Sequence, residues 1–264
     1  MCEVPEVLSC PSIDPRPYTD KSFSRDFISM SLFDRITCQA IRLGSQVLAA
    51  RRIETSVTGL EHIPMDGPVL LVARHYHHLF DGVVLLLSLP RPIHILVTLD
   101  WATNNYARLL MTQATALASW PVVERSDCLR VCGKRERTCK RKILRASSRR
   151  QRSALTDSVA LLAQGRVLVV FPEGYPNIDP RYTPKTRPEE FLPFRTGFAA
   201  IAAAAEKRLD VRVPIVPSGL HYTKNNRWIV RLNIGQAVYL GDFVSRQLLV
   251  RYVEQRVVEL SRLP

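Results

Sequence analysis

Residues 74–82, RHYHHLFDG, place three of the chain's six histidines within four positions. His75, His77 and His78 precede Asp81 by a few residues. An imidazole that titrates near neutral pH can accept a proton from a hydroxyl, and a carboxylate can fix its tautomer and stabilise the imidazolium. The chain has no G-x-S-x-G elbow, so an activated substrate hydroxyl is a simpler attacking group than a protein nucleophile. The stretch therefore predicts a histidine and aspartate general base.

A metal site is the alternative reading of the same cluster. His75, His77, His78 and Asp81 resemble the H-x-H-x-D-H signature of dinuclear metallohydrolases, but that signature has a histidine where this chain has Gly82. A metal site needs its full ligand count. The histidines that remain to supply it are His62, His94 and His221. We therefore expect no metal and no cofactor, and a metal-dependent hydrolase stays as the alternative.

A second motif lies about a hundred residues further on. Residues 169–174, VVFPEG, end an apolar stretch with Phe171, Pro172, Glu173 and Gly174. Alone, this sequence indicates only a turn after a strand.

The elements between the motifs alternate. Val69 to Val72 form a continuous apolar run, which is typical of a strand buried on both faces. We expect helices over 79–89, 104–119, 154–165, 196–209 and 244–260, strands at 94–97, 121–125, 166–171 and 212–217, and two short strands near 227–235. This alternation predicts an α/β fold, in which a layered, mixed and largely parallel sheet is flanked by helices. His75 would follow the end of a strand, where ligands usually bind in such sheets.

The N-terminal part differs from this core. Residues 1–25 show no periodicity and predict a loose leader, and residues 26–50 predict an amphipathic helix. Its apolar stripe would either dock on the domain core or contact a membrane surface. We expect one domain over 26–264.

Charge and hydropathy limit the partners. The chain has 264 residues, 46% of them hydrophobic, and a net charge of +13. This charge favours phosphorylated substrates, anionic lipid headgroups or nucleic acid. No apolar run reaches the roughly 18 residues that span a bilayer, and the N-terminus lacks a secretory signal. We expect a cytoplasmic protein with reduced cysteines.

Residues 126–152 hold eleven lysines and arginines and only two acidic residues. Such a basic segment is more often a solvated loop insertion, and contact with lipid or nucleic acid is the alternative. Cys128, Cys132 and Cys139 lack the paired spacing of a structural zinc site.

The order of these motifs resembles the phospholipid/glycerol acyltransferase (PlsC-like) family. Its landmarks are an N-H-x4-D turn, an arginine that ends a second strand, an F-P-E-G turn and a late V-P strand. Here RHYHHLFD, VVER with Arg125, FPEG at 171–174 and VPIVPSG at 213–219 follow in the same order, and the resemblance covers about residues 55–240.

The opening motif departs from the family pattern. Five residues separate His75 from Asp81 where the family has four, and Arg74 stands in place of asparagine. We assign His75 as the base because a buried strand fixes which residue emerges at its end, while an extra turn residue is easily absorbed. His77 is the reserve base, since it would face Asp81 if the helix began early.

The resemblance implies acyl transfer from acyl-CoA or acyl carrier protein, as co-substrate, to glycerol 3-phosphate or a lysophospholipid, with 1-acylglycerol 3-phosphate favoured. It implies that Arg125 and residues Phe171 to Gly174 hold the glycerol phosphate. Arg195, in the PFRTG segment, is a weaker phosphate candidate, and a solvated charge at the start of a helix is the alternative. FPEG is followed here by YPNIDP instead of the family's usual threonine, arginine and serine. We expect peripheral contact with an anionic membrane and no nucleic-acid partner; a catalytically inactive lipid- or nucleic-acid-binding relative is a further alternative.

Overall fold

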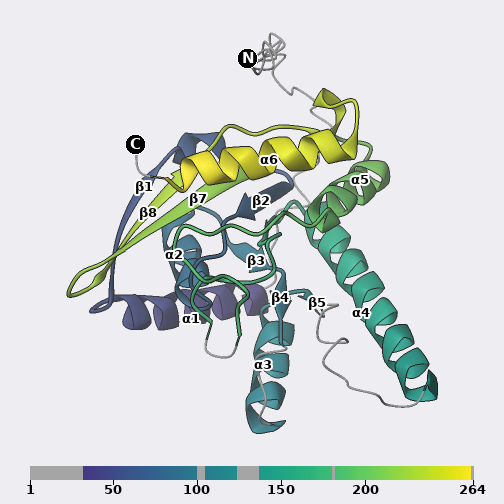
Figure 1. The fold of residues 1–264 in the computed structure, drawn as a ribbon, viewed down its shortest axis with the longest axis horizontal. Helices are drawn as coiled ribbons and strands as arrows, with labels where there is room; N and C mark the ends of the chain where they lie inside the picture. Colours follow the sequence, from purple (N-terminus) through teal and green to yellow (C-terminus); the bar gives the residue numbers. More distant parts are fainter. Residues whose placement is uncertain (1–31, 100–104, 124–136, 180–181, 263–264) are drawn as a thin grey trace, which may run out of the picture.

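The centre of the fold is a mixed six-stranded sheet (Figure 1). The structure is a computed structural model that describes residues 32–99, 105–123, 137–179 and 182–262. The strand order is β1-β8-β7-β2-β6-β3, and only the pairing of β7 with β8 is antiparallel. The predicted layered and largely parallel sheet is confirmed. The strands are β1 (Ile53–Thr58), β2 (Val69–Ala73), β3 (Ile93–Ile95), β6 (Val167–Val170), β7 (Ile215–Lys224) and β8 (Trp228–Ile234).

The position of β2 inside the sheet, between β7 and β6, explains why its sequence is apolar throughout. All five of its side chains are buried. Leu70 and Val72 join a cluster with helices α4 (Arg137–Ala163), α5 (Gly197–Leu209) and α6 (Arg246–Leu260), whereas Val69 and Leu71 pack with α2 (Phe80–Ser88) on the other face. In Figure 1, α6 runs along the upper side of the sheet and α2 lies below it. Each large aliphatic side chain buried in this way contributes about 1.5–3 kcal/mol.

The register brings the two sequence motifs to one edge of the sheet. Strands β2 and β6 are parallel neighbours, with Val72 opposite Val170. The chain therefore leaves both strands in the same direction, into the histidine turn after β2 and the F-P-E-G turn after β6. Strand β7 lies on the other side of β2, with Ser218 opposite Ala73, and its later residues extend past the histidine turn.

The N-terminal helix packs on the domain with one face and exposes large apolar side chains on another. Within the described residues it is α1 (Leu32–Ala49), and it packs beside α2, where Arg42 Nη2 donates to the carbonyl of Leu87 at 3.2 Å. Ser45 is buried, yet Leu43 and Val47 expose 63% and 74% of their surface. No helix in the described ranges combines the length and hydropathy needed to cross a bilayer.

Three smaller elements complete the region below the sheet: α3 (Asn105–Leu117), β4 (Val97–Thr98) and β5 (Val122–Val123). The described part of the strand expected at 121–125 is β5, which pairs with β4 in a separate two-stranded sheet instead of joining the main one. The end of the strand expected at 94–97 likewise separates into β4.

One further expectation about strands was wrong, and one strand was not predicted. Residues 228–234 form the single strand β8, because β7 continues to Lys224 and provides the antiparallel partner. Strand β1 was missed, since Ile53 and Val57 are its only apolar residues and the exposed Thr55 interrupts the alternation between them. It pairs in parallel with β8.

The basic segment is not a loop over its whole length. Helix α4 begins at Arg137, well before the expected start at Ala154. Arginine, lysine and glutamine are good helix formers even without an apolar stripe, so propensity extends the helix outward. Described side chains from Ser148 to Ser153 are exposed, as expected for a solvated segment. Residues 1–31 and 124–136, which include the leader, Arg125, Cys128 and Cys132, lie outside the described residues, as does the side chain of Cys139.

Candidate active site

His75 and Asp81 form a direct pair. His75 Nδ1 lies 2.8 Å from Asp81 Oδ2, the aspartate side chain exposes 1% of its surface, and the imidazole exposes 15%. Asp81 lies in the first turn of α2, and the chain leaves β2 at Ala73, so strand end and helix start together bring the two side chains into contact. Since Nδ1 is bonded to the carboxylate, Nε2 is the ring nitrogen left for a substrate proton.

The buried carboxylate of Asp81 receives several hydrogen bonds. The backbone N–H of Tyr76 donates to Oδ2 at 2.7 Å, and that of His77 lies 3.1 Å from both oxygens. The hydroxyl of Tyr222, on β7, donates to Oδ1 at 2.6 Å. These donors stabilise a buried negative charge and fix the orientation in which it faces His75.

His77 has a different environment. Its Nδ1 accepts the backbone N–H groups of Leu79 and Phe80 at 3.3 Å each, at the start of α2. Burial, and secondarily the neighbouring His78, lowers the pKa of His77 to about 4. Helix α2 begins at Phe80, after His77, so the ring of His77 lies at the helix entrance and only its backbone N–H reaches Asp81. The extra residue of the opening motif is absorbed in this turn.

The F-P-E-G turn lies against the histidine turn. The ring of Phe171 stacks on that of His75, with centroids 4.5 Å apart and planes 19° apart. Gly174 closes the turn by donating to the carbonyl of Phe171 at 3.1 Å, with a left-handed φ of 76° that favours glycine. A Cβ there would lie 3.3 Å from Cζ of Arg195, so the glycine also leaves room for the guanidinium.

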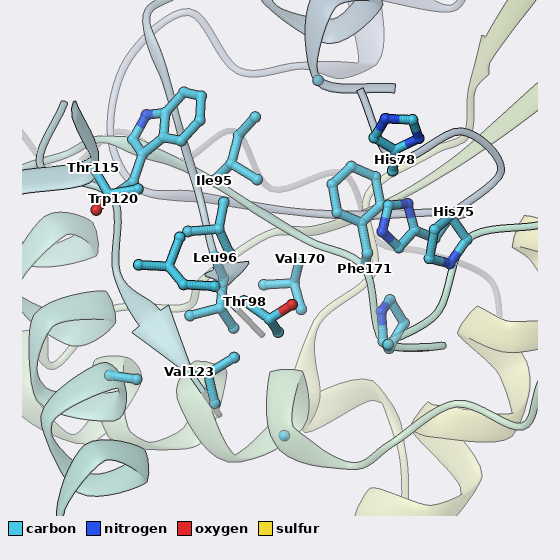
Figure 2. A pocket seen from close by; sticks show the side chains of 18 of the residues that line it. His75, His78, Ile95, Leu96, Thr98, Thr115, Trp120, Val123, Val170 and Phe171 are labelled. Atoms are coloured by element: carbon cyan, nitrogen blue, oxygen red, sulfur yellow. The ribbon is translucent and has the colours of Figure 1, made fainter. Parts of the chain in front are cut away.

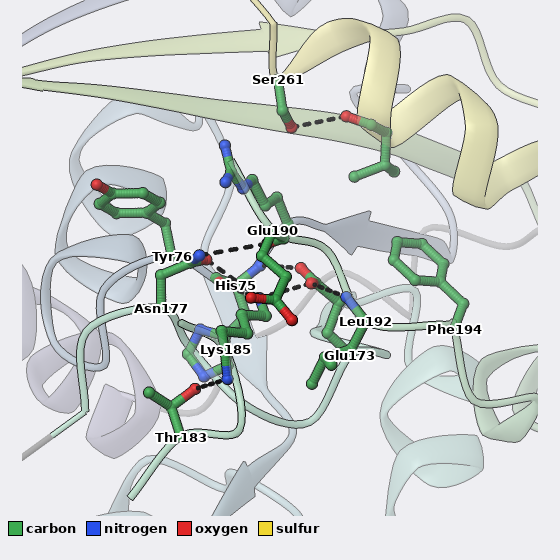
Figure 3. A network of polar contacts seen from close by, with 12 residues as sticks. His75, Tyr76, Glu173, Asn177, Thr183, Lys185, Glu190, Leu192, Phe194 and Ser261 are labelled. Carbon is green, nitrogen blue, oxygen red and sulfur yellow. Dashed lines mark hydrogen bonds and ion pairs between the residues drawn. The ribbon is translucent and has the colours of Figure 1, made fainter. Parts of the chain in front are cut away.

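Glu173 turns into the protein, where it holds the backbone of His75 (Figure 3). Oε1 accepts the N–H of His75 at 3.0 Å, and Oε2 accepts the N–H of Leu192 at 3.0 Å. Lys185 Nζ lies 2.6 Å from Oε2 and also donates to the carbonyl of His75 at 2.9 Å and to Asn177 Oδ1 at 3.1 Å. Burial lowers the pKa of Lys185, and Glu173 opposes that shift.

Arg74, which stands where the family has asparagine, is directed towards β7 and the segment after the F-P-E-G turn. Its guanidinium donates to the carbonyls of Leu220 at 3.3 Å and Pro188 at 2.6 Å, and it lies over the rings of Tyr76 and Phe191. Burial lowers its pKa, against the opposing charges of Glu173 and Asp81. The substitution therefore ties the histidine turn to β7 and to the segment after the F-P-E-G turn.

A cavity of about 850 Å³ opens beside His75. Figure 2 shows His75 and Phe171 together at one side, while Thr115 and Trp120 lie at the other. Most of its lining is apolar and comes from α1, α2, α3, β3, β4, α4 and α5. The expected site residues that line it are His75, Phe171, Pro172, Gly174 and Arg195; Asp81, His77 and Glu173 do not. Its size and apolar walls suit a hydrocarbon chain.

Sequence reasoning did not identify Tyr222 or Lys185. Tyr222 lies 141 residues from its partner Asp81, and Lys185 lies 110 residues from His75, so no local spacing connects them. A lysine in a proline-rich loop carries no signal of burial, and a tyrosine on a strand usually indicates packing.

The three neighbouring imidazoles do not converge on one point. His75 faces Asp81, His77 faces the helix start, and Nδ1 of His78 lies 3.1 Å from the carbonyl of Ile178. In the part of the chain that the structure describes, no group of three or more histidine, cysteine, aspartate or glutamate side chains is arranged to hold a metal ion. The geometry gives the hydrolase alternative no support.

Comparison with known proteins gives independent information on the family and the fold. The model of the acyltransferase family matches residues 54–221, more than half of the chain. Uncharacterized proteins of Mycobacterium tuberculosis and Mycobacterium bovis are 30% identical over 165 residues, which is 62% of this chain but only 36% of those relatives. The chain thus matches little more than a third of their length.

A solved structure shares the fold. The 1-acyl-sn-glycerophosphate (LPA) acyltransferase PlsC from Thermotoga maritima superposes with a TM-score of 0.55 at 20% identity, over 89% of this chain and 84% of that one. At this identity the likeness concerns the fold. Together with the family match, it confirms the resemblance that the order of the motifs carried: the chain belongs to the acyltransferase family and has a PlsC-like fold.

Proposed function

We propose that the protein transfers a fatty acyl group from acyl-CoA or acyl carrier protein to the hydroxyl of glycerol 3-phosphate or a lysophospholipid, with 1-acylglycerol 3-phosphate as the favoured acceptor. The observation that carries this proposal is a His75–Asp81 pair that opens onto a large apolar cavity. The pair supplies a base for the acceptor hydroxyl, and the cavity supplies a place for the acyl chain. The family match supports acyl transfer as the reaction class.

The reaction needs one proton relay. His75 Nε2 accepts the proton of the acceptor hydroxyl while its oxygen attacks the carbonyl carbon of the thioester. Asp81 stabilises the imidazolium that forms. The tetrahedral intermediate then breaks its C–S bond, and the leaving thiolate takes the proton from His75. An ester and a free thiol result, and the base returns to its starting state.

The F-P-E-G turn has two functions in this proposal. Phe171 stacks on the imidazole and restricts its rotation, and Glu173 fixes the backbone of His75. Because both oxygens of Glu173 are engaged within the protein, we assign it to support of the base and not to the acceptor. Arg195, which lines the cavity beside Gly174, is the described side chain suited to the acceptor's phosphate, because a guanidinium fork matches phosphate oxygens.

We also propose peripheral contact with an anionic membrane through α1 and α3. Both helices line the cavity, and both carry large apolar side chains that are more than half exposed. These side chains, which we call the apolar rim, are Ile36, Leu43, Val47, Tyr106, Leu109, Leu110 and Leu117. Exposed Arg149, Arg150 and Arg152 on α4 add positive charge that favours anionic headgroups. Insertion of the rim would bring the cavity to the lipid phase, where a lysophospholipid acceptor resides.

Mass spectrometry of reaction products tests the proposed reaction. The protein is incubated with acyl-CoA or acylated carrier protein and, in parallel, with glycerol 3-phosphate, 1-acylglycerol 3-phosphate and other lysophospholipids. We expect a product heavier than the acceptor by one acyl group, formed fastest from 1-acylglycerol 3-phosphate. Release of free fatty acid with no acylated product would indicate a hydrolase, and it would contradict the proposal.

A further inference from the structure

Among the described residues, Tyr222 is the side chain that hydrogen-bonds Asp81 from outside the histidine turn. Its hydroxyl donates to Asp81 Oδ1 at 2.6 Å, and its own ring is buried. The Oδ2 atom of the same carboxylate bonds Nδ1 of His75 at 2.8 Å. One carboxylate is thus shared between a neutral donor on β7 and the imidazole.

Rigid packing holds the tyrosine in this position. Its ring stacks on Tyr76, with centroids 4.5 Å apart and planes 10° apart, and meets the edge of Trp228 at 5.8 Å. Burial, followed by the negative charge of Asp81, raises the pKa of Tyr222 well above its ordinary value. The phenol therefore stays protonated and acts as a hydrogen-bond donor throughout the working pH range.

We propose that Tyr222 is a positioning residue that sets the proton affinity of His75 through Asp81. A donor on Oδ1 draws negative charge away from Oδ2, so the carboxylate stabilises the imidazolium less strongly. The hydrogen bond from Tyr222 thus favours the neutral imidazole, which is the form that can act as a base. The proposal deepens the proposed function, because it rests on His75 being the base.

Other charged and titratable groups surround the pair, and each remains in place when only Tyr222 changes. They come from the histidine turn, from the F-P-E-G turn and from the segment after it, and comprise Arg74, Tyr76, His77, His78, Glu173 and Lys185. A comparison of two single hydroxyl deletions therefore isolates the bond from Tyr222.

The chain offers a matched control in Tyr76. Tyr76 and Tyr222 stack face to face, but Tyr76 reaches Asp81 through its backbone N–H, so its hydroxyl is not the donor to the carboxylate. Tyr222→Phe and Tyr76→Phe thus each remove one oxygen from the same aromatic stack, and only Tyr222→Phe removes a hydrogen bond to Asp81.

The experiment is an NMR titration of the His75 imidazole in the full chain, together with the pH profile of kcat/KM. In Tyr222→Phe we expect the His75 midpoint and the acid limb of the profile to move to higher pH by about 0.5 to 1 unit, while Tyr76→Phe leaves the midpoint in place. Equal midpoints in the two variants would overturn the inference. If Tyr222→Phe does not fold, 3-fluorotyrosine at position 222, a stronger donor of the same shape, must move the midpoint to lower pH; an unmoved midpoint would overturn it as well.

The titration also separates this inference from the proposed function. It needs no substrate, so it reports on Tyr222 even if no acyl transfer is detected. Conversely, an active enzyme with equal midpoints in both variants would reject the role of Tyr222 and leave the reaction unaffected.

Discussion

Lys185 Nζ lies 2.6 Å from Glu173 Oε2, and neither side chain exposes any surface to solvent. The pair holds both backbone polar groups of His75, since Glu173 accepts its N–H and Lys185 donates to its carbonyl. Two buried opposite charges depend on each other, because removal of either leaves the other without compensation in a medium of low polarity. The backbone of His75 is therefore held by an ion pair whose two residues do not line the cavity.

Loss of this pair should be costly. Lys185→Met leaves Glu173 buried and unpaired, so we expect the free energy of unfolding to fall by about 3–5 kcal/mol, measured by chemical denaturation. Arg256→Met is the control, because Arg256 pairs with Glu259 on the exposed side of α6, and such surface pairs contribute about 1 kcal/mol or less. Equal losses in the two variants would show that the buried pair is not a support of the fold.

Stability should depend on pH through His77. Its pKa is about 4 in the folded chain and near 6.5 when unfolded. Between these values the unfolded chain binds the proton and the folded chain does not, so stability falls as the pH drops from 6.5 towards 4, by up to about 3 kcal/mol. Above 6.5 both states are neutral, and His77 contributes no pH dependence.

His77→Asn tests this account. The amide oxygen can accept the two N–H groups at the start of α2, and it does not titrate. We expect denaturation midpoints of His77→Asn to decline less than those of the wild type between pH 7 and pH 4.5. Parallel declines in the two proteins would mean that other groups carry the acid sensitivity.

The residues at the end of the cavity away from His75 should limit the length of the acyl chain that the enzyme accepts. Thr115 lines the cavity and is buried, while Thr112, on the same helix, is exposed; both hydroxyls bond to α3 carbonyls. Thr115→Leu should lower kcat/KM for the longest accepted acyl-CoA by roughly fourfold for each methylene that no longer fits. Thr112→Leu should leave the chain-length profile unchanged. Identical profiles for the two variants would place the acyl chain elsewhere.

Membrane contact should depend on the apolar rim. The double variant Leu43→Asp with Val47→Asp changes side chains that are already exposed, so we expect it to fold and to bind anionic vesicles roughly tenfold more weakly in flotation assays. Leu248→Asp on α6, where the leucine is 47% exposed, is the control. If all three proteins float equally, another surface contacts the lipid.

The sequence was most informative where local pattern and position coincide. The continuous apolar run of β2 identified a buried strand, and its end predicted that His75 would emerge towards Asp81, with His77 kept as the reserve base. The predicted helix at 154–165 was shorter than α4, because the basic stretch before it has no apolar periodicity although its residues favour helix. Strand β1 was not predicted because Ile53 and Val57 are its only apolar residues, and because its partners on β8 lie far along the chain.

The side chains that support the site could not be predicted from the sequence for the same reason. The bonds that Tyr222 and Lys185 make to the histidine turn span more than a hundred residues, and the sheet register that creates them has no local signature. Glu173 was expected at the substrate because of the motif it belongs to, but the direction of its side chain is set by Lys185 and by the backbone of Leu192. Spacing alone carries no information about such long-range contacts.

The most direct test of the account is the turnover of His75→Gln beside that of His77→Asn, with acyl-CoA and 1-acylglycerol 3-phosphate as substrates. We predict that His75→Gln remains folded and loses about 10² to 10⁴ in kcat, while His77→Asn stays within tenfold of the wild type. Wild-type turnover in His75→Gln would contradict the assignment of His75 as the base, and with it the proposed mechanism.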